Sequence, residues 1–288
     1  LIINDGAQLI VNNEVAATLE IGIINPTSWS ESNKEGWQFI SSPFTNANIS
    51  DFTELDTYDL YRYDGSQNLE WINQKVDANN FEETFQQGVA YLASYQNEDY
   101  AYLKGNVNTG KSFTKMLSYN ETKDLANFHL IGNPFPFDMD WTEVKPYGLA
   151  TGYAVVNNQG GYDYFSSGTI KVGEGFFVKA LNATATFMYG NTRGDKGMEE
   201  TNSISIVATG KAGSDNVVIN MFREGEGFPK MRNFNEQIAT LYVENNGVNY
   251  GVYNCDENTT EVVLNFDAKE MGNYTIAISE LIEVTNKF

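Results

Sequence analysis

Short apolar stretches separated by turn residues recur in the last third of the chain. They are spaced as in hairpins, and the segments between them are rich in Asn, Asp and Gly. This pattern predicts an antiparallel β-sandwich over residues 200–288. The predicted strands cover residues 203–208, 217–222, 239–243, 250–253, 262–266 and 274–278.

The beginning of the chain has a similar pattern. Short apolar runs alternate with Asn-Asp-Gly and Asn-Asn turns up to about Ile24, and no helical period competes with them. We therefore expect residues 1–35 to contribute short strands that lead into the central region.

The central region contains a strand pattern that occurs twice. Residues 36–44 read Gly-Trp-Gln-Phe-Ile-Ser-Ser-Pro-Phe and residues 127–135 read Asn-Phe-His-Leu-Ile-Gly-Asn-Pro-Phe, so that Pro134 lies 91 positions after Pro43. Each copy continues with a strand that runs into a turn, over residues 58–65 and 152–158.

Both copies then have a polar-aromatic strand, around Trp71 and around Tyr164, and a closing apolar strand after a glycine. Gly175 lies 87 positions after Gly88. These similarities predict an internal duplication, with β repeat 1 over residues 36–126 and β repeat 2 over residues 127–199. The two repeats either pack their apolar faces together as one domain or each close into a small sandwich.

The predicted fold class is therefore all-β: tandem antiparallel β-sandwich modules with an internal duplication, followed by a C-terminal β-sandwich. Composition agrees with this prediction, because aromatic residues make up 14% of the chain, with 17 Tyr and 18 Phe, and such residues favour strands.

The charge balance limits the classes of partner. The chain has 18 Lys and Arg and 38 Asp and Glu, which gives a net charge of −20. This negative charge repels phosphate backbones and anionic lipids. We expect no nucleic-acid partner. We also expect no membrane insertion, because no apolar run approaches the roughly 18 residues of a membrane span. Cys255 is the only cysteine, so no internal disulfide can form.

The start of the chain bears on localisation. It opens Leu-Ile-Ile-Asn-Asp-Gly, without an initiator Met, and we interpret it as part of a longer polypeptide whose export signal and anchor lie outside it.

Residues 105–112 (Gly-Asn-Val-Asn-Thr-Gly-Lys-Ser) match the phosphate-binding loop in every fixed position. Such a loop needs a helix N-terminus behind it, whereas residues 113–119 have the pattern of a strand. We therefore expect a coincidental match and no nucleotide site. The Arg193-Gly194-Asp195 tripeptide, known from integrin recognition, is likewise interpreted as a turn between domains.

Candidates for catalysis and metal binding are few. His129 is the only imidazole, so a two-His zinc site is excluded, and a half-buried strand histidine is the favoured interpretation. Carboxylates at Asp138 with Asp140, at Asp56 with Asp59, and at Asp64 could hold calcium in loops. None has the spacing of a recognised calcium loop, so we predict no cofactor, assign no metal ligands and no catalytic residues, and leave structural calcium open.

Aromatic rings are the candidates for ligand contact. The tryptophans are Trp29, Trp37, Trp71 and Trp141. Trp37 precedes the repeated Pro-containing strand and is matched by Phe128 in the second copy, which favours core packing. Trp71 and Trp141 remain candidate ligand contacts, with core packing as the competing interpretation.

Five segments together indicate a known type of protein: residues 39–44 with 130–135, residues 58–64 with Glu70 and Trp71, residues 173–180, and residues 272–276. In them the chain resembles repeat regions of large secreted or outer-surface adhesin-like proteins of the Bacteroidetes type. That resemblance implies extracellular display, a binding or scaffolding role, and no catalytic residues.

We therefore predict a noncatalytic segment of a larger surface protein, located extracellularly or on the outer cell surface. It would bind a protein or carbohydrate ligand, such as a host, matrix or glycan partner, through its loops. The alternative is a carbohydrate-binding module of a polysaccharide-processing or uptake system.

Overall fold

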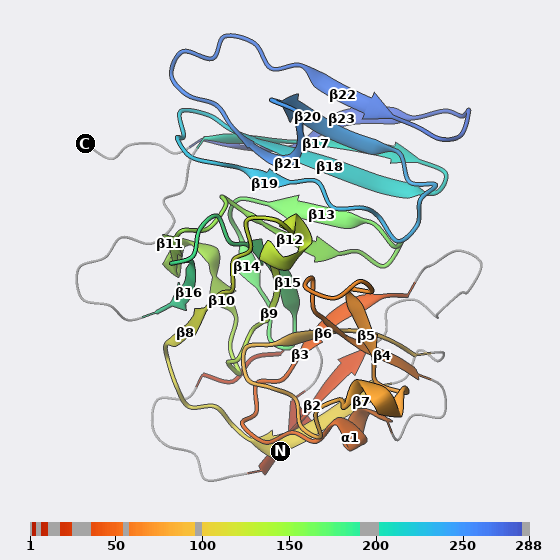
Figure 1. Ribbon diagram of the computed structural model, residues 1–288, viewed down its shortest axis with the longest axis vertical. Coiled ribbons are helices and arrows are strands. Elements are labelled where there is room, and N and C mark those ends of the chain that lie inside the picture. Colours follow the sequence, from red (N-terminus) through yellow and green to blue (C-terminus); the bar gives the residue numbers. More distant parts are fainter. Residues whose placement is uncertain are drawn as a thin grey trace.

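The chain is all-β, as the strand pattern predicted. The computed structural model describes residues 2–3, 7–10, 18–24, 36–53, 58–95, 100–190 and 202–283. Its sheets are stacked along the longest axis, with the N-terminal strands at one end and the C-terminal sheet at the other (Figure 1). The helices of the described residues are short: α1 (Ile49–Thr53) and 3-10 turns at Asp77–Asn79, Asp124–Asn127 and Trp141–Glu143.

Two four-stranded antiparallel sheets form the centre of the molecule. The first has the order β3-β6-β4-β5 and the second the order β9-β15-β12-β13. In both, the strand that comes last in sequence lies between the first and the second. The strands of the first sheet are β3 (Gln38–Ser41), β4 (Tyr58–Tyr63), β5 (Trp71–Asn73) and β6 (Ala90–Tyr95). Those of the second are β9 (Phe128–Gly132), β12 (Tyr153–Val156), β13 (Tyr162–Phe165) and β15 (Gly175–Lys179).

Smaller sheets flank these two. One has the order β1-β2-β7 and another the order β11-β16-β8, and β10 pairs with β14. The strands of the first are β1 (Ile2–Ile3), β2 (Thr18–Ile24) and β7 (Tyr100–Asn106). The others are β8 (Phe113–Met116), β10 (Met139–Asp140), β11 (Val144–Tyr147), β14 (Thr169–Ile170) and β16 (Thr186–Tyr189).

Each four-stranded sheet is buried on both faces. Successive residues of a strand point to opposite faces, and here both faces carry apolar side chains. In β3, Ile40 shares a buried cluster with Leu103 of β7, whereas Phe39 packs edge-on against Phe177 of β15, 5.3 Å between ring centres. In β15, Phe176 faces β16 instead. Burial on both faces explains the apolar pair Phe39-Ile40 in β3 and the apolar run from Phe176 to Val178 in β15.

Two glycines allow the four-stranded sheets to approach each other closely. A Cβ atom on Gly175 would lie 2.2 Å from the Cβ of Ala90, and one on Gly132 would lie 2.4 Å from the Cβ of Ser41. Any larger side chain at these two positions would therefore overlap the facing sheet.

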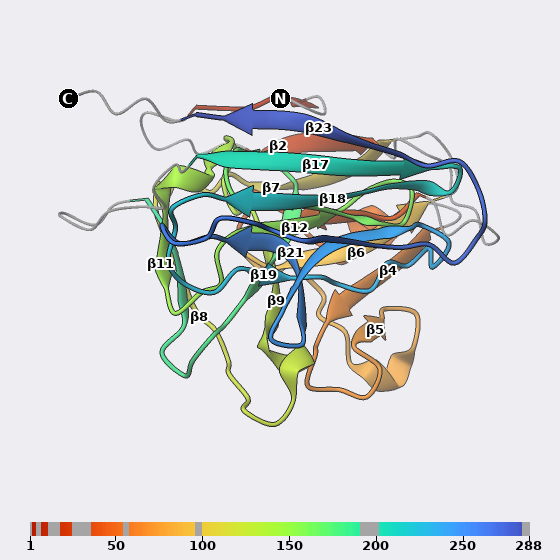
Figure 2. The ribbon, with the colours of Figure 1, turned by 90° about the horizontal axis from the view of Figure 1, so that it is seen from above.

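The last third of the chain forms one seven-stranded sheet. Its order is β22-β20-β21-β18-β17-β23, with β19 paired to β21, and its strands run side by side when the molecule is viewed from that end (Figure 2). The strands are β17 (Ser203–Gly210), β18 (Gly213–Asn220), β19 (Phe228–Pro229), β20 (Thr240–Asn245), β21 (Val248–Asn254), β22 (Leu264–Asp267) and β23 (Thr275–Ile282).

All six strands predicted in this region are confirmed, with ends shifted by a few residues. The prediction that all of them pair antiparallel was wrong at one place, because β18 and β21 are parallel. The reason is the connection: β19 and β20 lie between these two strands in sequence, so β21 enters beside β18 without a hairpin between them. Among the described residues, no helix is both long and apolar enough to cross a bilayer.

The close approach of the sheets leads to a stability prediction. We expect Gly175→Ala to lower the free energy of unfolding by about 2 kcal/mol, because the added methyl group overlaps Ala90 and overpacking of a core costs 1–3 kcal/mol. Gly272→Ala is the matched control, since its added methyl group would have only a ring carbon of Tyr274 nearby, at 3.7 Å. Urea unfolding of both variants measures the difference, and equal stability would contradict the prediction.

Candidate functional site

The two candidate tryptophans belong to different apolar clusters, and both pack against other aromatic rings. Trp141 is 1% exposed and packs against Tyr153 and Phe176. This burial leaves Trp141 no surface for ligand contact, because it shares a buried cluster with residues of β9, β15 and β16. Trp71 is half-buried and stacks on Phe39, with Phe234 of the C-terminal region 5.7 Å away.

Trp37 is also packed against other aromatic rings. Trp37 is half-buried against Tyr61 and Phe234, in agreement with the core packing expected for it. Trp29 lies outside the described residues, as do the Arg193-Gly194-Asp195 tripeptide and Asp56.

The octet at residues 105–112 has the wrong structure for a phosphate loop. Gly105 lies within β7, and a strand, β8, follows the octet where a phosphate loop would need a helix. The backbone N–H groups of Asn108 and Gly110 already donate to the Pro43 carbonyl and to the Asn108 side chain, respectively. The strand predicted after the octet is confirmed.

The predicted position of His129 is also confirmed. The residue is half-buried in β9, and its Nε2 lies 2.9 Å from the carbonyl oxygen of Ser118. Burial lowers the pKa of His129 below 6.5. The hydrogen bond with the Ser118 carbonyl acts to raise this pKa, and the positive charge of Lys115 acts to lower it.

Four of the five carboxylates named for calcium belong to the described residues, and each of these four is bonded within the protein. Asp138 accepts from the Val172 N–H, Asp140 caps the 3-10 turn at Trp141, Asp64 caps the turn that follows it, and Asp59 pairs with Lys75. Over the described ranges, no three His, Cys, Asp or Glu side chains gather as a metal site.

A groove of about 580 Å³ lies between β13 and the C-terminal sheet. One wall is the segment from Asp163 to Gly168, and the floor is the face of β17, β18 and β23 that points toward it. Six serines contribute to its lining: Ser166, Ser167, Ser203, Ser205, Ser214 and Ser279. A large concave site with several polar groups is the ordinary starting point for a binding hypothesis.

The alternation of β17 produces the polar floor. Ser203, Ser205 and Val207 point to the groove, whereas Ile204 and Ile206 point to the opposite face, where Ile206 joins the core of the C-terminal sheet. The strand therefore separates a hydroxyl-bearing face from an apolar face by the period of two that all strands have.

Asn216 joins β13 to the C-terminal sheet. Its side-chain amide accepts a hydrogen bond from the Tyr164 N–H and donates one to the Tyr164 carbonyl, both at 2.8 Å. The Asn216 side chain thus forms the two backbone hydrogen bonds at the edge of β13 that a neighbouring strand would otherwise form. The Tyr164 hydroxyl accepts from the Met231 N–H at 2.8 Å, and the ring covers Gly251, where a Cβ would lie 2.2 Å from it.

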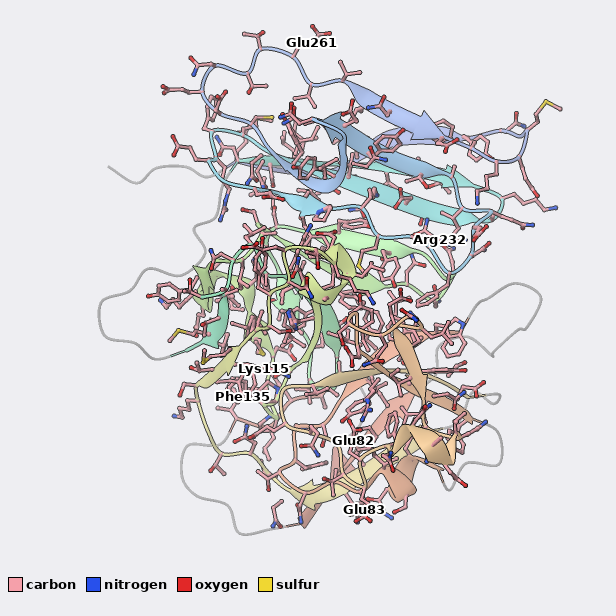
Figure 3. All side chains as sticks on the ribbon, viewed as in Figure 1. Glu82, Glu83, Lys115, Phe135, Arg232 and Glu261 are labelled. Carbon is pink, nitrogen blue, oxygen red and sulfur yellow. The ribbon has the colours of Figure 1, made fainter. Side chains whose placement is uncertain are left out.

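A buried ion pair lies beneath this contact. Lys230 Nζ is 2.8 Å from both carboxyl oxygens of Asp215, and the two side chains are 5% and 1% exposed. Lys230 Nζ also donates to the Asn216 carbonyl and lies 4.0 Å from the ring centre of Tyr164. In Figure 3, Arg232 of the same loop lies at the boundary between β13 and the C-terminal sheet.

Burial shifts the pKa values of the ionisable side chains in this region. It lowers the pKa of Lys230 and raises the pKa of Asp215, and in both cases the ion pair opposes the shift. Burial likewise raises the pKa of Asp163 on the groove wall, against a hydrogen bond from the Asn157 amide. Within the part of the chain that the structure describes, the groove lining includes the acids Asp163, Asp215 and Glu280 and no cation, so this lining disfavours anionic ligands.

Sequence reasoning missed the groove, because its lining comes from three separate regions of the chain, residues 163–168, 203–218 and 279–282. The Ser-Ile-Ser-Ile alternation at the start of β17 was the one available indication, since it marks a polar face on a strand. Nothing in the sequence connected Lys230 with Asp215 or Tyr164 with Asn216.

The buried ion pair leads to a second prediction. Lys230→Met leaves the Asp215 carboxylate buried without its partner, so we expect a loss of about 3–5 kcal/mol in the free energy of unfolding. Lys179→Met is the control: Lys179 is 2.8 Å from Asp124, which is 66% exposed, and such a pair contributes about 1 kcal/mol or less. Equal losses in urea unfolding would show that burial does not decide the cost.

His129 leads to a third prediction. Because its folded-state pKa is lowered, the unfolded chain binds the proton more tightly, and stability falls as the pH drops below about 6.5. His129→Gln should remove this part of the acid sensitivity. An NMR titration of the single imidazole, with unfolding measured at neutral and mildly acidic pH, tests both statements; a pKa at or above 6.5 would contradict them.

No protein-family model, curated protein or solved structure matches this chain. Its function is therefore argued from the groove and from the arrangement of the sheets.

Proposed function

We propose that the chain is a noncatalytic, adhesin-like segment of a larger extracellular or cell-surface protein, and that it binds a neutral glycan in the groove beside β13. The observation that carries this proposal is the lining of the groove, which contains six serines and, among the described residues, no cation.

Serine hydroxyls suit a polyhydroxylated ligand. Each hydroxyl can donate one hydrogen bond and accept two, which is also what a sugar hydroxyl can do. Ser279 and Glu280 on β23 are exposed along the groove, and the Phe165 ring at its edge is 37% exposed and stacked on Tyr153, 5.2 Å between centres. A rigid aromatic ring beside hydroxyl groups combines an apolar face with adaptable polar contacts.

The state of the carboxylates supports a binding role over catalysis. Glycoside hydrolysis needs two carboxyl groups that can act on the substrate. Here Asp215 is committed to Lys230 and Leu241, and Asp163 accepts from Asn157. Of the three carboxylates among the described lining residues, Glu280 alone is exposed to a ligand, which does not supply the pair that acid-base chemistry would use.

The same proposal includes the internal duplication, with two sandwich modules. Support comes from the strand register. Ile40 pairs with Tyr91 in the first central sheet and Ile131 pairs with Phe176 in the second. If the two isoleucines are equivalent, Gly88 corresponds to Gly173, 85 positions later, and not to Gly175 as the sequence comparison alone had indicated.

Contacts across the two modules support this equivalence, because they occur in matched pairs. The Ser41 N–H donates to the Gly173 carbonyl at 2.8 Å, and the Gly132 N–H donates to the Gly88 carbonyl at 3.3 Å. Likewise, Ile40 forms a bridge with Glu174, and Ile131 forms one with Val89. An approximate twofold relation between two copies of one module accounts for both pairs.

The flanking sheets extend the proposed modules. The β2–β7 pair lies before and after the first central sheet in sequence, and the β8–β16 pair brackets the second in the same way. Each central sheet shares a buried cluster with its own flanking strands. We therefore propose two small sandwiches that also pack against each other, followed by the C-terminal sheet.

A binding experiment tests the groove. We expect the purified chain to bind neutral glycans on an array that also carries extracellular-matrix proteins, and Ser279→Tyr, which fills the groove, to abolish that binding. Ser112→Tyr is the control, because Ser112 is equally exposed but lies in the loop before β8. Binding to matrix proteins alone, or binding unaffected by Ser279→Tyr, would contradict the proposal.

The aromatic edge has its own test. Phe165→Ala should weaken glycan binding by about tenfold, equivalent to ~1.4 kcal/mol, because it removes the ring at the groove edge. Phe266→Ala on β22 is the control, since that ring is 38% exposed and lies outside the groove lining. Isothermal titration calorimetry with the best array ligand compares the two, and equal affinities would remove Phe165 from the site.

A further inference from the structure

We propose that Lys230 and Asp215 condense into an intramolecular isopeptide bond, which joins Lys230 Nζ to Asp215 Cγ and links β18 covalently to the segment after β19. This inference does not depend on the ligand of the groove, because it rests only on the buried pair.

The two reacting groups are already in place. Lys230 Nζ lies at the same distance, 2.8 Å, from both carboxyl oxygens of Asp215, so it faces the carboxyl carbon between them. Asp215 belongs to β18, and Lys230 directly follows β19, both parts of one sheet. Holding two reactants in contact on a rigid scaffold replaces a bimolecular encounter by an intramolecular step.

Three further contacts hold the amine and the carboxyl group. The Asn216 carbonyl accepts from Lys230 Nζ at 2.6 Å, and the Tyr164 ring covers the same nitrogen at 4.0 Å from its centre. On the other side, the Leu241 N–H donates to Asp215 Oδ2 at 2.7 Å. A backbone N–H aimed at that oxygen stabilises the negative charge that develops on it when an amine attacks the carbon.

The step balances without any added reagent. The ammonium transfers a proton to one Asp215 oxygen, and the neutral amine attacks Cγ to form the C–N bond. A second proton passes from nitrogen to the same oxygen, the C–O bond breaks, and water leaves. The net change converts an ammonium and a carboxylate into an amide and one water molecule, with no oxidation or reduction.

The surroundings favour this direction. The side chains are 5% and 1% exposed, and burial disfavours charged forms, which lowers the pKa of Lys230 and raises the pKa of Asp215. A neutral amine and a neutral acid are the reactive forms. Little water surrounds the resulting amide, so its hydrolysis is disfavoured for the same reason.

The chain contains a matched pair that should stay unlinked. Lys179 Nζ lies 2.8 Å from an oxygen of Asp124, with the same residue types at the same separation, but Asp124 is 66% exposed. Its carboxyl group is open to water, which competes with the amine and hydrolyses any amide that forms. Burial with fixed donors, and not proximity alone, distinguishes the Lys230–Asp215 pair.

Intact-mass measurement of the purified, denatured chain tests the proposal. We expect the mass to be lower than the mass calculated from the sequence by one water molecule. Tryptic digestion should show no cleavage after Lys230 and should leave the peptide containing Asp215 joined to the peptide that begins after Arg223. Asp124 and Lys179 should appear in separate, unmodified peptides. A full calculated mass, with ordinary cleavage after Lys230, would overturn the proposal.

Two substitutions identify the bond chemically. Lys230→Arg should restore the full mass, since guanidinium does not form this amide, while it keeps the positive charge. Asp215→Asn should lose one ammonia molecule instead of water, because the leaving group changes. A mass loss of one water that persists in Lys230→Arg would place the modification elsewhere and overturn the assignment. The decisive measurement is made on the unaltered chain, so a poorly folding variant does not weaken the test.

Discussion

The structure depends on a layer of aromatic and aliphatic side chains between the two central sheets. Phe39 and Leu92 from the first sheet meet Leu130 and Phe177 from the second in one buried cluster. Because the outer faces of both sheets are buried as well, the layer has no freedom to shift toward solvent. The small residues at Gly132 and Gly175 let the backbones approach, and the hydrogen bonds that cross between the sheets require that approach. This packing fixes the position of β13, which carries the C-terminal sheet.

The C-terminal sheet is attached through apolar and polar contacts together. Phe228 packs against Phe128 and Tyr164, and the polar groups beside this contact form specific pairs. Asn216 completes the edge of β13, the Tyr164 hydroxyl accepts from the backbone, and Lys230 neutralises Asp215. Buried polar groups are costly when unpaired, so this contact specifies one arrangement of the two parts more strictly than apolar packing would. Since the polar contacts occupy one part of the boundary, the rest remains open as the serine-lined groove. The contacts that attach the C-terminal sheet and the proposed binding site therefore lie next to each other at the boundary between β13 and that sheet.

The strands were predictable because their patterns are local. The strands at residues 38–41 and 128–132 contain apolar residues flanked by turn-forming residues, and the C-terminal strands follow one another at the spacing of hairpins. The phosphate-loop match at residues 105–112 could be set aside for the same local reason, since a strand pattern follows Lys111. The burial of Trp141 could not be predicted in this way. A single tryptophan in a turn-rich segment has the same local sequence pattern whether it is buried or exposed, and it is the surrounding strands that bury Trp141.

The sequence by itself determined the all-β class, the positions of most strands and the acidic charge, because strand formation and net charge depend on neighbouring residues and on composition. The tertiary structure alone decided which strands pair, including the parallel contact of β18 with β21. It also decided that Lys230 meets Asp215 and that serines from three separate regions line one groove. These are contacts between residues far apart in the chain, and their energies depend on burial and geometry that no local pattern encodes.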